Sequence, residues 1–466
     1  MSEPVTLDDA RPVECATLPQ ARYMVLAFVC SLSMITYLDR VCFGVAAPQI
    51  AADLNLASVA DLKWAFTAFA IAYAIFEVPT GWLGDRLGPR SMLTRIVLWW
   101  SACTALTGLV GLEYAGWTFG GLGALILLRF LFGAGEAGAY PNITRVIYNW
   151  FPPHQWEMAQ GYVWMSGRLM GGITPFLWAI LVTGTGNTSP LVSWREAFLI
   201  FGVIGVIWCL LFRMLFQNLP PSTASKDPLA HEQSHSHDNV PWKWLLTNRE
   251  LILLCLAYSL LNYGWAFNIT YLPAYLQQRF SGAASPAIIA IYAGAPLWIG
   301  ALGCLSGGYC VSWMDRWLKN RRLSRKLLGM TAMLGCALCW AIASQADNLH
   351  LFCWSVASAA FCVDLTLGSA WATCQDIGRK HTAVAAALMN TIGTMGAALA
   401  VWLTGTLVQQ AVSQRAVLEN LPVSSLSESI RDEAAIQGFQ YVFVTYLCVY
   451  LAAALCWLLM RPTRDI

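Results

Sequence analysis

Charge is scarce in this sequence. Asp, Glu, Lys and Arg together make up 12% of the 466 residues, whereas hydrophobic residues make up 57%. A water-soluble domain carries about 25% charged residues, so a chain with half that share cannot cover a globular surface in water. The formal net charge is only +2, which removes the electrostatic basis for binding nucleic-acid phosphates. The composition therefore indicates a protein of the lipid bilayer and excludes nucleic acid as a partner.

The sequence also lacks the patterns of disulfide scaffolds and metal sites. Nearly all of its 15 Cys residues stand singly inside apolar runs, which argues against bridges. The one Cys-x-x-Cys, at Cys336 and Cys339, has no second pair and no nearby His to complete a metal site. His231, His235 and His237 fall in a polar stretch, where a solvated linker is the simpler interpretation. No metal and no cofactor are expected.

Long apolar runs, in contrast, recur along the whole chain. A helix of about 20 apolar residues crosses a hydrocarbon core of about 30 Å, and about twelve such runs are present. They cover residues 23–46, 62–83, 92–112, 121–145, 158–182, 195–216, 250–276, 285–311, 327–346, 349–374, 381–412 and 438–460. Residues 1–20 carry four acids and one Arg, unlike the basic start of a cleaved signal peptide. We expect the first run to stay as an anchor.

These runs predict an all-α polytopic membrane protein with about 12 transmembrane helices in two pseudo-symmetric six-helix bundles. The expected divisions are a cytoplasmic tail at 1–22, a bundle at 23–216, a cytoplasmic linker at 217–249, a second bundle at 250–460 and a cytoplasmic tail at 461–466. With the N-terminus inside, about 20 of the 28 Lys and Arg residues lie on the cytoplasmic side. Both termini are therefore expected inside a cytoplasmic (inner or plasma) membrane, with residues 414–437 as the last outward loop.

Two related loop patterns lie about half a chain apart. Residues 81–90, GWLGDRLGPR, join the second and third runs, and residues 307–316 join the eighth and ninth. Gly81 and Gly88 permit close helix approach and a tight turn, and Asp85 can hold the positive N-terminal end of a neighbouring helix. The alternative is a loop whose cations only follow the positive-inside rule. We expect a gate formed by Gly81, Asp85, Arg86, Gly88, Arg90 and Asp315.

Ionisable residues within the apolar runs are costly in lipid, so each one is a candidate functional residue. They are Asp39, Arg40, Glu77, Arg129, Glu136, Arg168 and Asp364. Arg129 and Glu136 are seven residues apart and share one helix face, about 10 Å apart along the axis. Arg40 adds a second guanidinium, which suits fork-like recognition of a carboxylate. The alternative is a set of ion pairs that only fix packing, such as Asp39 with Arg129.

Several motifs resemble one known family. Residues 128–142, LRFLFGAGEAGAYPN, and 149–152, NWFP, resemble the fourth span of the anion:cation symporter family of the major facilitator superfamily. Residues 37–40, YLDR, resemble the first-span signature of its bacterial members, and residues 81–90 resemble the loop signature of the whole superfamily. The family includes bacterial galactonate and hexuronate transporters, sialin and the vesicular glutamate transporters. The resemblance covers essentially the whole membrane region and implies a transporter, not an enzyme.

The resemblance also implies roles for individual residues. The implied substrate-binding residues are Arg40 and Arg129 for the carboxylate, with Tyr73, Ser369 and Asn390 as further contacts. The implied proton-coupling residues are Asp39 and Glu136. Two positions depart from the family: Glu77 stands where relatives often carry an uncharged polar residue, and Arg168 where some have Gln. We place Arg168 at the substrate, where it favours a second anionic group; neutralisation of Glu77 is the alternative. The role of Asp364 stays open.

The expected function is proton-coupled symport of an organic anion, such as a sugar acid or another small carboxylate. Burial favours the neutral form of a carboxyl group, so Asp39 and Glu136 would take up protons and free the arginines for substrate. The two halves would then rock about the filled site, driven by the transmembrane proton gradient. Uniport and sodium-coupled transport are the alternatives. A monomer is expected, because the site lies within one chain.

Overall fold

The structure, a computed structural model, describes residues 19–56, 59–114, 117–184, 189–218, 240–280, 284–422 and 425–460. The described chain is almost entirely helical. Its strands, β1 (Glu113–Tyr114) and β2 (Trp117–Thr118), pair antiparallel in one small hairpin. Most of the expected linker, with its three His residues, lies outside the described residues.

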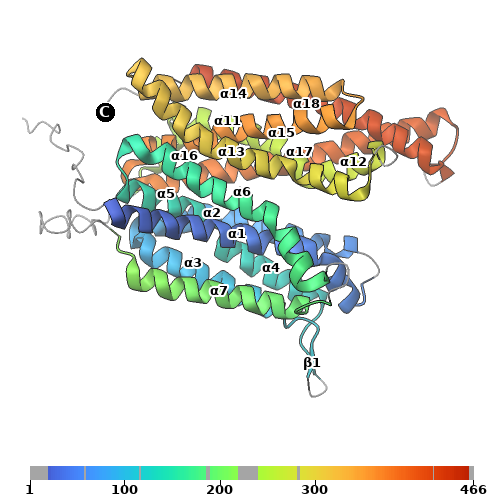
Figure 1. Cartoon of the computed structure of the whole chain (residues 1–466), viewed down its shortest axis with the longest axis horizontal. Coiled ribbons are helices and arrows are strands. Elements are labelled where there is room, and N and C mark those ends of the chain that lie inside the picture. Colours follow the sequence, from blue (N-terminus) through green and yellow to red (C-terminus); the bar gives the residue numbers. More distant parts are fainter. Residues whose placement is uncertain are drawn as a thin grey trace, which may run out of the picture.

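The first half of the chain forms one helical bundle, coloured blue to green in Figure 1. Its helices are α1 (Pro19–Asp53), α2 (Lys63–Leu87), α3 (Pro89–Thr107), α4 (Leu122–Glu136), α5 (Ala139–Trp150), α6 (Trp156–Trp178) and α7 (Trp194–Leu215). Short helical turns flank them: η1 (Val59–Leu62), η2 (Pro153–Gln155) and η3 (Ala179–Thr183). Within the bundle, α1 packs on α6, α2 on α4, and α3 on α7.

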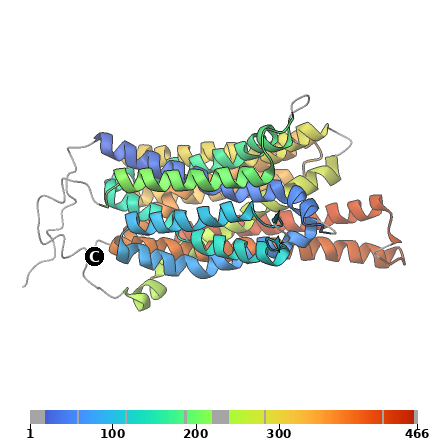
Figure 2. The same cartoon turned by 90° about the horizontal axis from the view of Figure 1, so that it is seen from below.

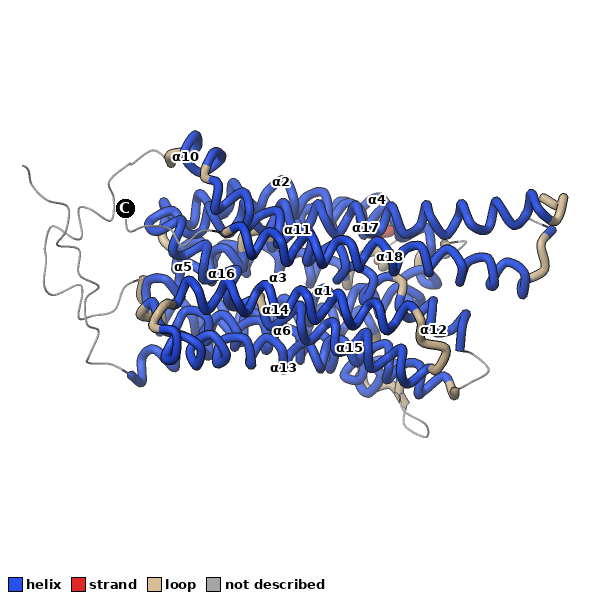
Figure 3. The backbone as a smooth tube through the Cα atoms, turned by 90° about the horizontal axis from the view of Figure 1, so that it is seen from above, coloured by secondary structure: helices blue, strands red, loops and turns tan. Residues whose placement is uncertain are grey.

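The second half forms the other bundle, coloured yellow to red in Figure 1. Its helices are α11 (Arg249–Thr270), α12 (Leu272–Phe280), α13 (Pro286–Leu318), α14 (Arg321–Ser344), α15 (Leu349–Leu365), α16 (Leu367–Gly378), α17 (Thr382–Leu418) and α18 (Glu428–Leu459). The short helix α10 (Trp242–Thr247) precedes them and lies outside the bundle at one end (Figure 3). Helix α1 begins and α18 ends at this same end, which we call the terminal end.

Ten described segments are long and apolar enough to cross a membrane. One of them, Leu349–Leu418, holds α15, α16 and α17, which reverse direction at η4 (Arg379–His381) and therefore form two crossings. Helix α3 is not among the ten, but its 19 residues span about 28 Å and pack against α4 and α7. Dividing the long segment and adding α3 gives twelve crossings, which confirms the predicted fold class.

The prediction that residues 414–437 form an outward loop is wrong for most of this segment, which is helical. Helix α17 continues to Leu418 and α18 already begins at Glu428, so the two helices project together beyond the rest of the molecule (Figure 2). They remain helical outside the apolar region because they pack on each other and because Ala, Gln, Glu and Arg are strong helix formers. An i,i+4 ion pair, Arg415–Glu419, supports the end of α17.

Close helix contact joins the two halves. On α6, a Cβ at Gly161 would lie 2.5 Å from the carbonyl oxygen of Cys304 on α13. On α13, a Cβ at Gly308 would lie 2.7 Å from the Cα of Met158. Small residues permit such close packing within a membrane, where helix association depends on van der Waals contact. The facing pairs α6–α13 and α2–α17 therefore form the seam between the bundles.

Candidate functional site

The fourth crossing is a broken helix, and the break places a carboxyl group inside the molecule. Helix α4 ends at Glu136, and Gly138 then adopts a left-handed conformation (φ 83°) before α5 begins. The backbone carbonyls at this buried break have local partners, because Thr80 donates to the carbonyl of Ala137 at 3.0 Å and Asn142 donates to that of Gly138 at 2.8 Å. The glycine-rich sequence thus explains the break.

Glu136 pairs with an arginine of the first crossing. The Arg40 Nε donates to Glu136 Oε1 at 2.5 Å, while Glu136 Oε2 has no hydrogen-bond partner. The Glu136 side chain is fully buried, but 30% of the Arg40 side chain is exposed. The Arg40 guanidinium also lies 4.8 Å from the ring centre of Tyr73. Of the predicted site residues, the structure therefore brings Arg40, Glu136 and Tyr73 together.

Arg129 is buried without a carboxylate contact. Its guanidinium lies 4.1 to 4.9 Å from the ring centres of Phe43, Phe69 and Phe132, and its Nε has no hydrogen-bond partner. The ion pair between Asp39 and Arg129 that the sequence left open as an alternative does not form, since neither carboxylate oxygen of Asp39 has a hydrogen-bond partner. Asp39 and Glu136 lie within electrostatic range of Arg129 but do not contact it. Because a buried charge without a direct partner is costly, Arg129 is able to accept an anion.

Arg168 pairs with Asp364 across the seam. Its Nε and Nη2 each donate to one carboxylate oxygen at 3.0 Å, and its Nη1 lies 2.9 Å from the Tyr37 hydroxyl. The guanidinium also stacks on Trp265, 3.7 Å from the ring centre. Only 5% of the Arg168 side chain and none of Asp364 is exposed. The alternative that Arg168 neutralises Glu77 is therefore wrong.

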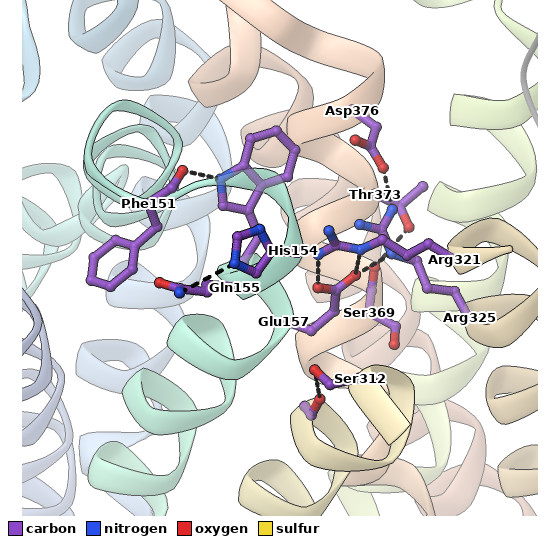
Figure 4. Close-up of polar contacts among 12 residues, drawn as sticks. Phe151, His154, Gln155, Glu157, Ser312, Arg321, Arg325, Ser369, Thr373 and Asp376 are labelled. Atoms are coloured by element: carbon purple, nitrogen blue, oxygen red, sulfur yellow. Dashed lines mark hydrogen bonds and ion pairs between the residues drawn. The ribbon is translucent and has the colours of Figure 1, made fainter. Parts of the chain in front are cut away.

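Glu77 also bridges the two halves, but through neutral groups. Its two oxygens accept hydrogen bonds from Asn390 Nδ2 at 2.5 Å and from Thr391 Oγ1 at 3.1 Å, both on α17. Asn390, a predicted substrate contact, is thus held by Glu77 in this conformation. Ser369 lies elsewhere, beside Glu157 in Figure 4, and its buried hydroxyl oxygen has no hydrogen-bond partner.

Asp85 lies at the N-terminus of α17, in the other half of the molecule. Its two oxygens accept from the backbone N–H groups of Ala383 and Val384 at 3.2 and 2.9 Å. A carboxylate in this position satisfies free N–H groups and interacts favourably with the helix dipole. Gly81 makes the approach possible, because a Cβ there would lie 2.8 Å from the carbonyl oxygen of Ala383. This arrangement at the terminal end matches the one expected from the loop pattern.

The other loop residues position the turn that carries Asp85. Gly88 has a φ of 81° and links α2 directly to α3. The Arg90 backbone N–H donates to Asn218 Oδ1 at 2.9 Å, and its guanidinium donates to the carbonyl of Arg213. Arg86 lies over the Trp82 ring at 5.5 Å. These contacts tie the loop to the end of α7.

The second half does not repeat the Asp85 arrangement. No hydrogen bond or ion pair reaches the Asp315 side chain from any residue that the structure describes. Instead, Glu157 in the first turn of α6 binds Arg321 and Arg325 of α14, and Arg325 also binds Asp376 (Figure 4). Sequence reasoning missed this cluster. The sequence does contain one sign of it, because Glu157 is an acid in the first turn of the fifth crossing and lies, like Asp85, at the terminal end.

Replacing Asp85 by Asn should loosen the first turn of α17. The change removes the negative charge opposite the helix N-terminus and should raise amide exchange at Ala383 and Val384 by about tenfold or more, since hydrogen bonds to charged groups contribute about 1.5–3 kcal/mol. Hydrogen–deuterium exchange would measure it. Asp315→Asn is the matched control and should leave that turn unchanged. Equal exchange in both variants would contradict the assigned contact.

Most of the sequence is similar to known transporters. Residues 29–401 match the family model of the Major Facilitator Superfamily. A protein named a probable sulfoacetate transporter in Cupriavidus necator is 30% identical over 389 residues, covering 80% of this chain and 84% of the relative. The hexuronate transporter of Bacillus subtilis is 28% identical over 394 residues, covering 83% and 88%. A probable L-galactonate transporter of Escherichia coli is 27% identical over 391 residues, covering 81% and 79%.

Solved structures agree on the fold. A proton:xylose symporter superposes with a TM-score of 0.69 at 14% sequence identity, over 95% of this chain and 96% of that one. A human organic anion transporter superposes with a TM-score of 0.64 at 13% identity, over 94% and 99%. Two helical bundles with ionisable groups buried at their seam define a membrane transporter. The chain belongs to the major facilitator superfamily, and its relatives confirm the predicted resemblance to the anion:cation symporter branch.

Proposed function

We propose that this protein imports a small organic anion together with protons. The observation that carries the proposal is the neighbourhood of Arg40, whose only carboxylate partner among the described residues is the fully buried Glu136. A buried pair of this kind is broken only when another anion replaces the carboxylate or a proton neutralises it. Symport requires substrate binding and proton uptake at the same group, because the binding of one then depends on the binding of the other.

The substrate class follows from the arginines and from the relatives. Two guanidinium groups, Arg40 and Arg129, are suited to hold an acidic group through paired hydrogen bonds. The relatives are named as transporters of sulfoacetate, hexuronate, galactonate, and galactarate or glucarate. Each of these molecules carries at least one acidic group on a short chain. We therefore place a sugar acid or another small carboxylate on Arg40 and Arg129, with Tyr73 beside it.

The transport cycle uses the two bundles as moving bodies, residues 23–216 and 250–460. Asp39 and Glu136 take up protons while the site is open outward, the substrate anion pairs with the freed arginines, and the bundles rock about it. The tails and the linker, 1–22, 461–466 and 217–249, lie in the cytoplasm under a cytoplasmic membrane. Asp85 and the Glu157 cluster then close the cytoplasmic side in the present conformation. The protein acts as a monomer, and not as an enzyme.

Uptake into proteoliposomes tests the proposal. Labelled sulfoacetate, glucuronate and galactonate are offered with and without an inward proton gradient, at fixed sodium, and then with sodium replaced at fixed pH. We expect one acid to accumulate only with the proton gradient and independently of sodium. Accumulation that follows sodium, or equilibration that ignores both ions, would overturn proton coupling in favour of sodium symport or uniport.

A further inference from the structure

The Arg40–Glu136 pair has a counterpart that the proposed cycle does not use. The tenth crossing, like the fourth, is divided into two helices, since α15 ends at Leu365 and α16 begins at Leu367, although the backbone of Thr366 between them stays helical. Asp364 lies in the last turn of α15, as Glu136 lies in the last turn of α4. The fourth and tenth crossings occupy corresponding positions in the two halves. Each of these crossings thus presents one fully buried carboxyl group to one arginine.

Both carboxylates occupy positions where negative charge is unfavourable. Glu136 lies at the last turn of a helix, which carries the negative end of the helix dipole. Burial away from water adds a desolvation cost for both carboxylates. Each carboxylate therefore needs either its arginine or a proton. In this structure the arginine supplies the compensation, and Arg168 grips Asp364 with two parallel hydrogen bonds. That geometry is the one by which an arginine recognises any carboxylate.

The two arginines lie in one neighbourhood. Tyr37 and Arg40 are three residues apart on α1 and therefore side by side on one face of the helix. The Tyr37 hydroxyl lies 2.9 Å from Arg168 Nη1, and both guanidinium groups lie within electrostatic range of that hydroxyl. Tyr37 thus stands between two cations, each of which holds an internal carboxylate.

Resting on the proposed function, we propose that the substrate carries two anionic groups, as in a dicarboxylate or a sulfocarboxylate, and that Arg168 binds the second one. One end of the substrate replaces Glu136 on Arg40, and the other replaces Asp364 on Arg168. Each displaced carboxyl group takes up one proton, so with the proton on Asp39 two negative charges enter with three protons. Arg168 is the cation facing Asp364, with the Cys304 thiol beside it. Because Arg168 and Asp364 belong to different halves, binding the second group also releases a contact across the seam.

The test compares acids that differ by one charged end. D-glucarate and D-gluconate share a carbon chain and differ in a terminal carboxylate against a hydroxymethyl group; sulfoacetate and glycolate differ in a sulfonate against a hydroxyl. Binding to the purified protein in nanodiscs is measured by calorimetry. Loss of two charge-assisted hydrogen bonds should weaken binding by about 100-fold or more, so at least one dianion should bind about that much more tightly than its monoanion partner.

Two variants test whether Arg168 causes the preference for a dianion. Arg168→Gln removes the cation but leaves Asp364 buried alone, so the double variant Arg168→Gln with Asp364→Asn keeps the pair neutral and protects the fold. In the double variant the dianion should fall to the affinity of its monoanion, whose own affinity should stay within about threefold. A retained preference for the dianion, or a wild type that binds a monoanion as tightly, overturns the role of Arg168 and leaves the proposed function standing. Binding of none of the four acids overturns both.

Discussion

Replacing Glu136 by Gln is expected to preserve exchange of substrate across the membrane and to lose the share of pH-driven accumulation that the Glu136 proton supplies. Glutamine resembles the protonated side chain, so Arg40 stays free for substrate, but this position no longer binds or releases a proton. A gradient of one pH unit stores about 1.4 kcal/mol per proton, which supports about tenfold accumulation. The variant should lose at least that factor in proteoliposome uptake while counterflow exchange continues.

Glu77→Gln is the matched control for this variant. Glu77 is the other fully buried glutamate of the first half near Tyr73, but its oxygens face an amide and a hydroxyl instead of a guanidinium. It should therefore keep uptake that responds to pH. If Glu136→Gln retained the full pH-driven accumulation, Glu136 would not be a proton carrier, and its pair with Arg40 would serve packing alone.

Replacing Arg129 by Ala is expected to abolish substrate binding. Three aromatic rings surround this guanidinium and no carboxylate contacts it directly. A substrate anion would therefore supply the direct partner that the buried charge lacks. Each charge-assisted hydrogen bond of a guanidinium to an anion contributes about 1.5–3 kcal/mol. Loss of two such bonds should therefore lower the affinity measured by calorimetry by about 100-fold or more.

Arg129→Lys separates charge from geometry. Lysine keeps the positive charge but not the planar fork, so binding should weaken by about tenfold instead of disappearing. Size-exclusion chromatography and helicity by circular dichroism would show that both variants fold. An Arg129→Ala protein that bound substrate with wild-type affinity would remove Arg129 from the site.

Much of the fold and part of the site could be predicted because they depend on local patterns. The apolar runs gave twelve crossings, since a membrane demands long uninterrupted hydrophobic helices. Asp85 was expected at a helix N-terminus because its loop brings a charge next to two glycines, and the structure places it on the backbone of α17. The shared face of Arg129 and Glu136 could likewise be seen from their spacing, although the helix ends at Glu136 and its partner is Arg40.

The remaining contacts could not be predicted, because they join residues far apart in the chain. Arg168 and Asp364 are 196 positions apart, and no periodic pattern relates a residue of the fifth crossing to one of the tenth. The same holds for Glu157 with Arg321 and Arg325, whose cations looked like ordinary inside-facing charges. Such pairings depend on how the two bundles meet, and only the assembled helices reveal that.

Proton movement coupled to substrate is the central claim, and it can be measured directly. Proteoliposomes loaded with a pH-sensitive dye, held at equal pH on both sides and with the membrane potential clamped, are given the transported acid from outside. The account predicts that the lumen acidifies when substrate enters, and that Glu136→Gln lowers the number of protons entering per substrate while labelled substrate still exchanges. Substrate entry in the wild type without any change in luminal pH would contradict it.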